Sequence, residues 1–464
     1  MDRRHFLAAA SGASSLSFLA GKSPAASTPN VVIILCDDLG YADIGPYGSS
    51  ISTPNLDRMA REGMRFTHFT SANPVCSPSR AAWLTGRYPT RVGVPRVLFP
   101  ADTTGLPDSE VTLAQLFKGK NYKTMCVGKW HLGHLPPYLP TRRGFDEYYG
   151  IPYSNDMVPR VLLYNQETVE QTATLETLTQ RYTQQAVRFI ESARGTPFFL
   201  YMPHTMPHIP LGASERFRGK SPQGIYGDVV QEIDWSVGEV LDALKRTGAD
   251  RNTLVLFSSD NGPWFQGSPG RLRGRKGMTW EGGVRVPLLA RWPGQVPAGK
   301  VCSGLASAMD ILPTVSRLCG LSQAKNPPDG IDMGAMLLGK SQELERDVLL
   351  YFDDRYLQCA RMGNWKLHLS RYNNVTYSPA PAAGRFNLTL IRPELYDVVG
   401  DVDESYDVAA EHPEIVTRIL ARVEEKMGGF PEDIRKAWAD TKALRSAGGA
   451  TGAVTVLPAG VQKK

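Results

Sequence analysis

The chain has 464 residues, of which 42% are hydrophobic and 21% are charged, as is usual for a folded globular protein. Its formal net charge of +6 is spread out, without clustered Lys and Arg among aromatic residues, which argues against a nucleic-acid-binding protein. The length exceeds what one small core requires, so we expect a large α/β unit and a smaller one.

Residues 1–27 have the composition of an export signal. Arg3 and Arg4 precede an apolar stretch and a region of small residues, the order found in twin-arginine signals. The segment is too short and too rich in Ser, Gly and Ala for a stable membrane span, and no later stretch is apolar enough to form one. We therefore expect a periplasmic or secreted protein; the alternative is an ordinary disordered tail.

The cysteines are scattered along the chain and form no C-x-x-C pair. This spacing indicates neither a zinc site nor a disulfide scaffold. Cys302 and Cys319 are the one pair that we consider for a disulfide in an exported protein.

Two apolar stretches are each followed by a pair of polar residues of the types that bind metal ions. Residues 30–38 read N-V-V-I-I-L-C-D-D, and uniform hydrophobicity favours a strand buried on both faces of a parallel sheet. Asp37 and Asp38 follow that strand, and Asp260 and Asn261 follow a second β-branched strand at residues 252–259. Ligands bind at the carboxyl ends of such strands, where a parallel sheet would bring the two pairs together. Taken alone, Asp37 and Asp38 would be better explained as caps of the following turn.

Residues 76–86 read C-S-P-S-R-A-A-W-L-T-G, between a predicted helix at residues 53–66 and another at 106–119. A lone cysteine is most often a buried, unreactive side chain. If a helix begins in this turn, Arg80 lies on the same face as Cys76, four residues earlier.

The predicted strand at residues 122–127 leads into G-K-W-H-L-G at residues 128–133. Two residues apart in an extended chain, Lys129 and His131 would point to the same side and could meet one ligand. Further along, the loop at residues 150–157 contains Ser154.

A helix at residues 179–193 and a buried strand at 197–202 precede P-H-T-M-P-H-I-P at residues 203–210. Its prolines would hold His204 and His208 in a rigid loop. After a long helix at 227–247, the basic residues of 271–287, among them Lys276, suggest anion binding. A helix at 310–318 would close the large unit.

The composition changes near residue 347. Short strands are predicted at residues 348–351, 357–361 and 365–369, and a helix at 413–427. We therefore divide the chain into a catalytic domain at residues 28–345, a small domain at 346–430, and an extension at 431–464 whose end we expect to be flexible.

These motifs, in this order, resemble those of the type I sulfatases, the formylglycine-dependent and arylsulfatase-like members of the alkaline phosphatase superfamily. C-x-P-x-R followed by L-T-G-R is the family signature, and the resemblance extends over roughly residues 29–430. It implies an α/β fold with an alkaline-phosphatase-like large domain: a mostly parallel central sheet flanked by helices. It also implies a small C-terminal α+β domain with an antiparallel sheet.

The resemblance further implies a site chemistry. Cys76 would be converted to formylglycine by a separate generating enzyme, and the aldehyde hydrate would attack sulfur and then release sulfate. The metal, calcium with magnesium as the alternative, would be held by Asp37, Asp38, residue 76, Asp260 and Asn261, an oxygen set that suits a hard cation.

The remaining roles are also carried over from the family. Arg80 would orient the hydrate, and Lys129 and Lys276 would bind sulfate oxygens. His131 would be the base that releases sulfate, and His208 or Lys276 would assist the leaving group. Ser154 and His204 are candidates for substrate binding.

The resemblance implies a sulfuric ester hydrolase, with sulfated carbohydrates as substrates and aryl sulfates as surrogates. Two alternatives remain at this point. One is a phosphatase, phosphonate hydrolase or phosphomutase on the same fold. The other is a non-enzymatic protein that binds sulfated glycans.

Overall fold

The structure, a computed structural model, describes residues 28–374 and 386–447. The expected export signal and the end of the C-terminal extension lie outside these residues. Within the described ranges, no helix combines the length and apolar character that crossing a membrane requires.

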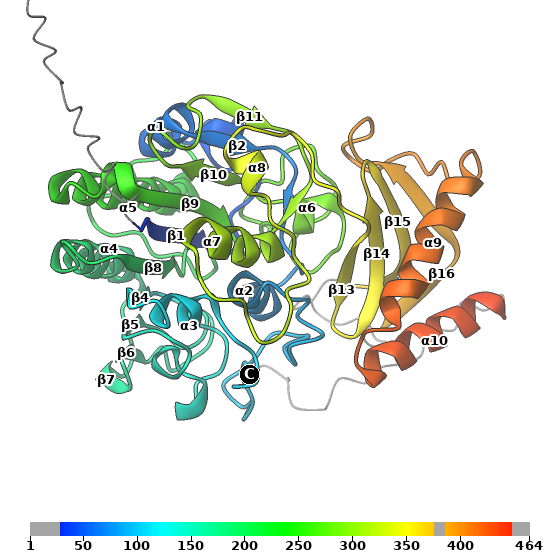
Figure 1. Ribbon diagram of the computed structural model, residues 1–464, viewed down its shortest axis with the longest axis horizontal. Helices are drawn as coiled ribbons and strands as arrows, with labels where there is room; N and C mark the ends of the chain where they lie inside the picture. Colours follow the sequence, from blue (N-terminus) through cyan, green and yellow to red (C-terminus); the bar gives the residue numbers. More distant parts are fainter. Residues whose placement is uncertain (1–27, 375–385, 448–464) are drawn as a thin grey trace, which may run out of the picture.

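A large mixed sheet forms the centre of the molecule (Figure 1). Its middle strands β9, β1, β8, β4 and β5 run parallel, and antiparallel strands extend it on both sides. From edge to edge its strands in the described residues are β11 (Lys300–Cys302), β2 (Met64–Phe66), β10 (Leu288–Arg291), β9 (Thr253–Ser259), β1 (Asn30–Cys36), β8 (Phe198–Pro203), β4 (Lys123–Val127), β5 (Glu147–Gly150), β6 (Leu162–Tyr164) and β7 (Glu167–Glu170).

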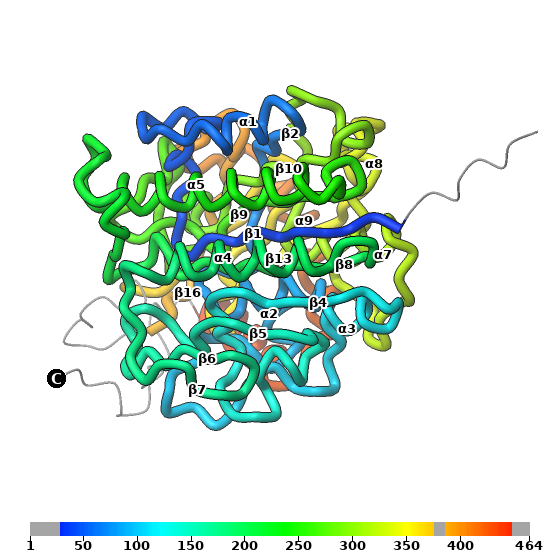
Figure 2. The backbone as a smooth tube through the Cα atoms, turned by 90° about the vertical axis from the view of Figure 1, so that its left-hand side faces the viewer, coloured from blue at the N-terminus to red at the C-terminus, as the bar shows by residue number. Residues whose placement is uncertain are grey.

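Helices cover both faces of this sheet, as the two perpendicular views show (Figures 1 and 2). One face packs against α1 (Pro54–Glu62), α4 (Leu175–Ser192) and α5 (Gly224–Thr247). The other packs against α2 (Cys76–Thr85), α3 (Leu113–Lys118), α7 (Ile311–Cys319) and α8 (Gly334–Leu337).

The position of β1 at the centre of the sheet explains why its sequence is apolar throughout. Successive side chains of a strand point to opposite faces, and here both faces lie under helices. Val31, Ile33 and Leu35 enter the core beneath α2 and α7, whereas Val32, Ile34 and Cys36 enter the core beneath α4 and α5. The only polar positions left to this segment are therefore at its ends, where Asp37 and Asp38 follow.

A separate antiparallel sheet lies beyond α2 and α6 (Glu281–Val284), on the right in Figure 1. It consists of β13 (Leu349–Asp353), β14 (Tyr356–Met362), β15 (Trp365–Tyr372) and β16 (Asn387–Asp397), covered by α9 (Pro413–Met427) and α10 (Glu432–Ser446). Ala82 of α2 and Val284 of α6 belong to the same apolar core as Leu367. The predicted fold class is thus confirmed. A further short sheet joins β3 (Phe69–Thr70) and β12 (Ala306–Ser307).

Some elements differ from those predicted. The helix expected at residues 106–119 is only α3, because Thr112 caps the backbone amide of Gln115 and fixes the start at Leu113. Strand β16 and helix α10 were not predicted. Helix α10 packs on the small sheet, where Trp438 is buried.

The disulfide considered between Cys302 and Cys319 is wrong, since both thiols are free. Cys302 lies in the edge strand β11, whereas the Cys319 thiol contacts the hydroxyl of Tyr122, just before β4. Five strands separate β11 from β4, on the order of 25–30 Å at ordinary strand spacing. A disulfide requires Cα atoms within about 7 Å.

Truncating the centre of β1 should destabilise the fold. Ile34→Ala removes a fully buried side chain and should lower the free energy of unfolding by about 2–5 kcal/mol in equilibrium denaturation. Val169→Ala on β7, where the side chain is 53% exposed, is the control and should change stability by less than about 0.5 kcal/mol. Equal changes in the two variants would contradict this account of the core.

Candidate active site

The polar pairs that follow β1 and β9 meet at one edge of the sheet. The two strands are parallel and in register, with Cys36 opposite Ser259, so their next residues emerge side by side. The backbone amide of Asp38 donates to Oδ1 of Asp260 at 3.2 Å, and Nδ2 of Asn261 donates to Oδ1 of Asp38 at 2.8 Å. The structure therefore brings together the two pairs that the sequence placed 222 residues apart.

Asp38 accepts from two further segments. Its φ of 65° lies in the left-handed region, which Asp tolerates better than most residues, and this turns the carboxylate into the cluster. Nζ of Lys276 donates to Oδ2 of Asp38 at 2.8 Å, and Nε2 of His208 lies 3.6 Å from the same oxygen.

Asp37 is held by a different lysine. Nζ of Lys129 donates to Oδ2 of Asp37 at 2.6 Å and to Oγ of Ser154 at 3.0 Å. Burial alone raises the pKa of Asp37, but Lys129 and the neighbouring cations outweigh burial and hold that pKa well below its usual range. Ser154 thus joins the cluster through Lys129.

Helix α2 brings Cys76 and Arg80 to the same edge. Cys76 is the first residue of α2, so its side chain stands at the positive end of the helix dipole. One turn later, Arg80 donates from Nε and Nη2 to Oδ2 of Asp260, at 3.0 and 2.8 Å, and from Nη1 to the carbonyl of Lys129 at 2.8 Å. Burial raises the pKa of the Cys76 thiol to about 12, so the unmodified thiol stays protonated.

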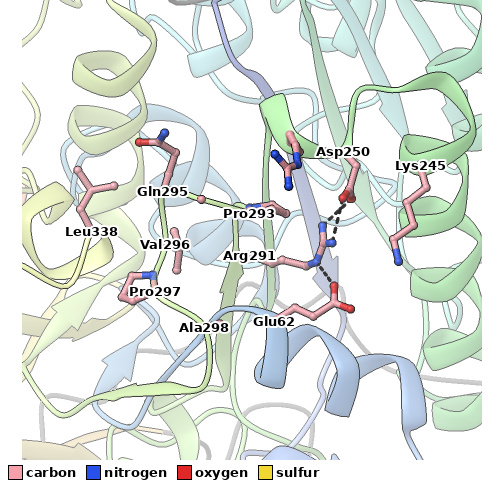
Figure 3. Close-up of a pocket in the computed structure, with 12 residues that line it drawn as sticks. Glu62, Lys245, Asp250, Arg291, Pro293, Gln295, Val296, Pro297, Ala298 and Leu338 are labelled. Atoms are coloured by element: carbon pink, nitrogen blue, oxygen red, sulfur yellow. Dashed lines mark hydrogen bonds and ion pairs between the residues drawn. The ribbon is translucent and has the colours of Figure 1, made fainter.

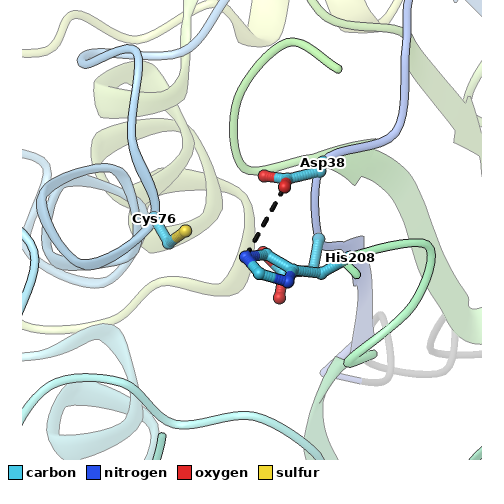
Figure 4. A group of neighbouring side chains, drawn as sticks. Asp38, Cys76 and His208 are labelled. Carbon is cyan, nitrogen blue, oxygen red and sulfur yellow. Dashed lines mark ion pairs between the residues drawn. The ribbon is translucent and has the colours of Figure 1, made fainter. Parts of the chain in front are cut away.

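Ligand atoms of Asp37, Asp38, Cys76 and His208 lie within 4.8 Å of one another, a grouping that could hold a metal ion. Figure 4 shows three of these residues, Asp38, Cys76 and His208. Asp260 is not part of this group; its two oxygens accept hydrogen bonds from Arg80 and from the amide of Asp38.

The oxygen atoms of the cluster suit a hard divalent cation. Oδ1 of Asp37 and Oδ1 of Asn261 are buried without a hydrogen-bond partner within the described part of the chain. Burial, together with the nearby charges of Asp37 and Asp38, raises the pKa of Asp260 to about 7, so at Asp260 the cation Arg80 does not offset the effect of burial. Two buried oxygens without hydrogen bonds, one of them 3.5 Å from Nη2 of Arg80, and a carboxylate whose burial is not fully offset favour binding of such a cation.

The histidines do not all join the cluster. His131 does not extend β4, because its φ of 59° turns the chain, and its Nε2 contacts the carbonyl of Leu98 at 2.8 Å. His204 instead lies under α5, with Nε2 3.5 Å from Oγ of Ser236, and burial lowers its pKa to about 4. The contact of His204 is thus with a helix on the far side of β8 from α2, and it does not reach the carboxylates.

Asn155 also lies beside the cluster and was not predicted from the sequence. Its Nδ2 donates to the carbonyls of Thr205 and His208, each at 3.0 Å, and so fixes the histidine loop to the loop of Ser154. The only available signal was its position next to Ser154.

A pocket of about 660 Å³ lies elsewhere (Figure 3). Arg291 lines it and is neutralised by Asp250 and Glu62. Arg291 pairs with Val255 near the start of β9, whereas Asp260 follows the end of that strand. The pocket therefore lies near the start of β9, whereas the cluster lies beyond the end of that strand.

Comparisons with known proteins agree with one another. The family model described as Sulfatase matches residues 29–321. N-acetylgalactosamine-6-sulfatase of Mus musculus is 41% identical over 400 residues, which cover 78% of this chain and 75% of that protein. Arylsulfatase A of Bos taurus is 38% identical over 449 residues and 88% of each chain.

Among solved structures, the crystal structure of Ps i-CgsB in complex with k-i-k-neocarrahexaose superposes with a TM-score of 0.76. It shares 30% sequence identity and covers 90% of this chain and 98% of that chain.

Proposed function

This chain belongs to the sulfatase family, and from that premise we propose that it hydrolyses sulfate monoesters of carbohydrates through a formylglycine formed from Cys76. The observation that carries the proposal is the position of Cys76, at the start of a helix and within 4.8 Å of the Asp37 and Asp38 ligand atoms. The names of the relatives, which include a sugar sulfatase and a protein bound to an oligosaccharide, support a carbohydrate substrate.

In this proposal the hydrate of the residue-76 aldehyde supplies two hydroxyl groups on one carbon, one to attack sulfur and one whose deprotonation expels sulfate. Arg80, one helical turn away, orients the hydrate. The conversion itself requires a separate formylglycine-generating enzyme.

The cations around the carboxylates would bind the sulfate group. Lys129 and Lys276 bring Nζ groups to Asp37 and Asp38 from different segments, so a sulfate beside residue 76 would accept hydrogen bonds from both. Ser154, already bound to Lys129, is a further donor. A calcium ion, or magnesium in its place, held by Asp37, Asp38, residue 76, Asp260 and Asn261 would supply Lewis acidity toward a sulfate oxygen.

His131 is suited to remove a proton. Nε2 of His131 faces the Leu98 carbonyl, which only accepts hydrogen bonds, so Nε2 carries the ring proton. Nδ1 then holds a free lone pair, and it is buried without a partner among the described residues. We assign His131 as the base that acts on the second hydroxyl.

Two groups can assist departure of the alcohol. Nε2 of His208 and Nζ of Lys276 both approach Oδ2 of Asp38. His208 is the more exposed of the two, at 6%, and so is the nearer to the solvent into which an alcohol would leave. His204 has no role in this proposal, because its contacts lie under α5.

Residue 76 should be formylglycine in active protein. The tryptic peptide spanning residues 66–80 should carry an aldehyde that a hydrazine reagent traps, and activity should rise in proportion to the aldehyde fraction seen by mass spectrometry. Cys76→Ala, which cannot form the aldehyde, should be folded and inactive. Full activity in protein whose peptide carries only unmodified cysteine would disprove the mechanism.

Asp260→Ala should lose the bound calcium and the activity together. It removes a proposed ligand and leaves the buried Arg80 without its carboxylate, which should weaken metal binding by at least about 10-fold. Metal content after dialysis measures this directly. Asp234→Asn is the control. Asp234 is also buried, but it accepts hydrogen bonds from backbone amides at α1, so this variant should retain the bound calcium. Unchanged metal content in Asp260→Ala would exclude Asp260 as a ligand.

The enzyme should prefer nitrophenyl sulfate to nitrophenyl phosphate. A sulfate monoester carries one negative charge and a phosphate monoester nearly two at neutral pH, and an unmatched charge is costly in a buried site. Sulfate is also the better leaving group when the ester on residue 76 breaks. Each ~1.4 kcal/mol of difference between the transition states changes kcat/KM about tenfold. A higher kcat/KM for the phosphate would favour the phosphatase alternative.

A further inference from the structure

The loop that carries Lys276 connects two parts of the cluster. The backbone amide of Lys276 donates to the carbonyl of Pro263, just after Asn261, at 3.0 Å. The next amide, of Gly277, donates to the carbonyl of Pro74 at 2.9 Å, two residues before Cys76. The position of the lysine therefore depends on how residues 273–285 fold.

This segment is closely packed on itself. The amide of Gly282 donates to the carbonyl of Arg273 at 2.7 Å, and that of Met278 donates to Arg275 at 3.0 Å. A Cβ added to Gly283 would lie 1.9 Å from the carbonyl oxygen of Met278, so even a methyl group has no room there. A displacement at residues 279–281 would accordingly be transmitted to Lys276.

Three consecutive residues of this segment are held by the small sheet. Oγ1 of Thr279 donates to Oε1 of Gln358 on β14 at 3.1 Å. The ring of Trp280 lies 4.1 Å from that of His368 on β15, centroid to centroid. Figure 1 shows α6, which begins with the next residue, between the large sheet and β14.

That next residue, Glu281, forms two buried ion pairs. Its Oε2 accepts from Nη1 of Arg361 and its Oε1 from Nζ of Lys366, each at 3.0 Å. Lys366 also lies 3.4 Å from Oε1 of Glu404, whose Oε2 accepts the backbone amide of Glu281 at 2.6 Å. All four side chains are at most 1% exposed.

Such a cluster fixes the backbone that carries it. A buried charge that loses its partner is strongly disfavoured, so Glu281 cannot move to the protein surface without breaking the cluster. Arg285 lies 3.8 Å from Glu281, and Arg273 donates to the carbonyl of Glu404 at 2.8 Å, which ties both ends of the segment to the same cluster.

We propose that β14 and β15 position Lys276: Arg361 and Lys366 hold Glu281, and the packed segment at residues 273–285 transfers that position to the lysine. None of the predicted site residues comes from the small sheet, so in this proposal the small sheet acts through the position of Lys276. The inference rests on the role in sulfate binding proposed above for Lys276.

A double-mutant cycle on hydrolysis of nitrophenyl sulfate tests this, with rates normalised to the aldehyde content of residue 76. Lys366→Met should lower kcat/KM by about 10- to 100-fold, since a misplacement near 1 Å has effects of this size. In a Lys276→Ala background the same substitution should lower kcat/KM by less than about twofold, because the group that it positions is already absent. Lys366→Arg, which keeps the cation, should retain most of the activity.

The control is Arg346→Met, which breaks another buried ion pair, with Asp310, away from this segment. It should lower the melting temperature while kcat/KM stays within twofold. If Lys366→Met does not fold, Thr279→Val replaces it in the double-mutant cycle. This substitution removes the hydroxyl that contacts Gln358.

Two results would overturn the proposal. One is an equal loss from Lys366→Met, or from Thr279→Val, in both backgrounds. The other is a lower melting temperature with unchanged kcat/KM. Failure of the proposed function has a different signature, because Lys276→Ala would then itself leave kcat/KM unchanged.

Discussion

Buried carboxylates at one edge of the large sheet require positive charge, and most of the site follows from that requirement. Asp37, Asp38 and Asp260 are all at most 2% exposed, and a buried carboxylate without a partner is strongly disfavoured. Each carboxylate therefore accepts a hydrogen bond from a cation on a segment distant in sequence, and Arg80 also lies 3.5 Å from Asp37. The pairs are Asp37 with Lys129, Asp38 with Lys276, and Asp260 with Arg80.

This pairing gives the site its geometry. Arg80 lies one turn from Cys76 on α2, so its hydrogen bonds to Asp260 also hold the start of that helix against the end of β9. The backbone carbonyl of Lys129 accepts from the same guanidinium, which ties the segment after β4 to both. An anion entering beside residue 76 would meet donors that are already in place, so little reorganisation would accompany its binding.

The same requirement recurs where the two sheets meet. Glu281 is fully buried, and its partners Arg361 and Lys366 come from the small sheet. Nonpolar contacts accompany these pairs, since Val284 of α6 and Ala82 of α2 share a core with β14 and β15. The small sheet is therefore packed against the elements that carry Cys76 and Lys276, and it is not an independent appendage.

The features that could be predicted from the sequence are those that follow from the local periodicity of a strand or a helix. The uninterrupted apolar run at residues 30–36 requires burial on both faces, which identifies a central strand and places Asp37 at its end. The four-residue spacing of Cys76 and Arg80 puts them on one face once α2 forms, because the period of a helix is a property of the chain. Such features need no knowledge of what packs against them.

Which distant segments meet depends on the arrangement of the strands and helices and could not be predicted from the sequence. His204 and His208 lie in one proline-rich loop with similar neighbours, yet one contacts Ser236 of α5 and the other approaches Asp38. Cys302 and Cys319 are 17 residues apart in sequence, but their strand and helix belong to separate regions of the sheet. These outcomes depend on strand order and on packing between elements, whereas sequence patterns record only the environment of each element.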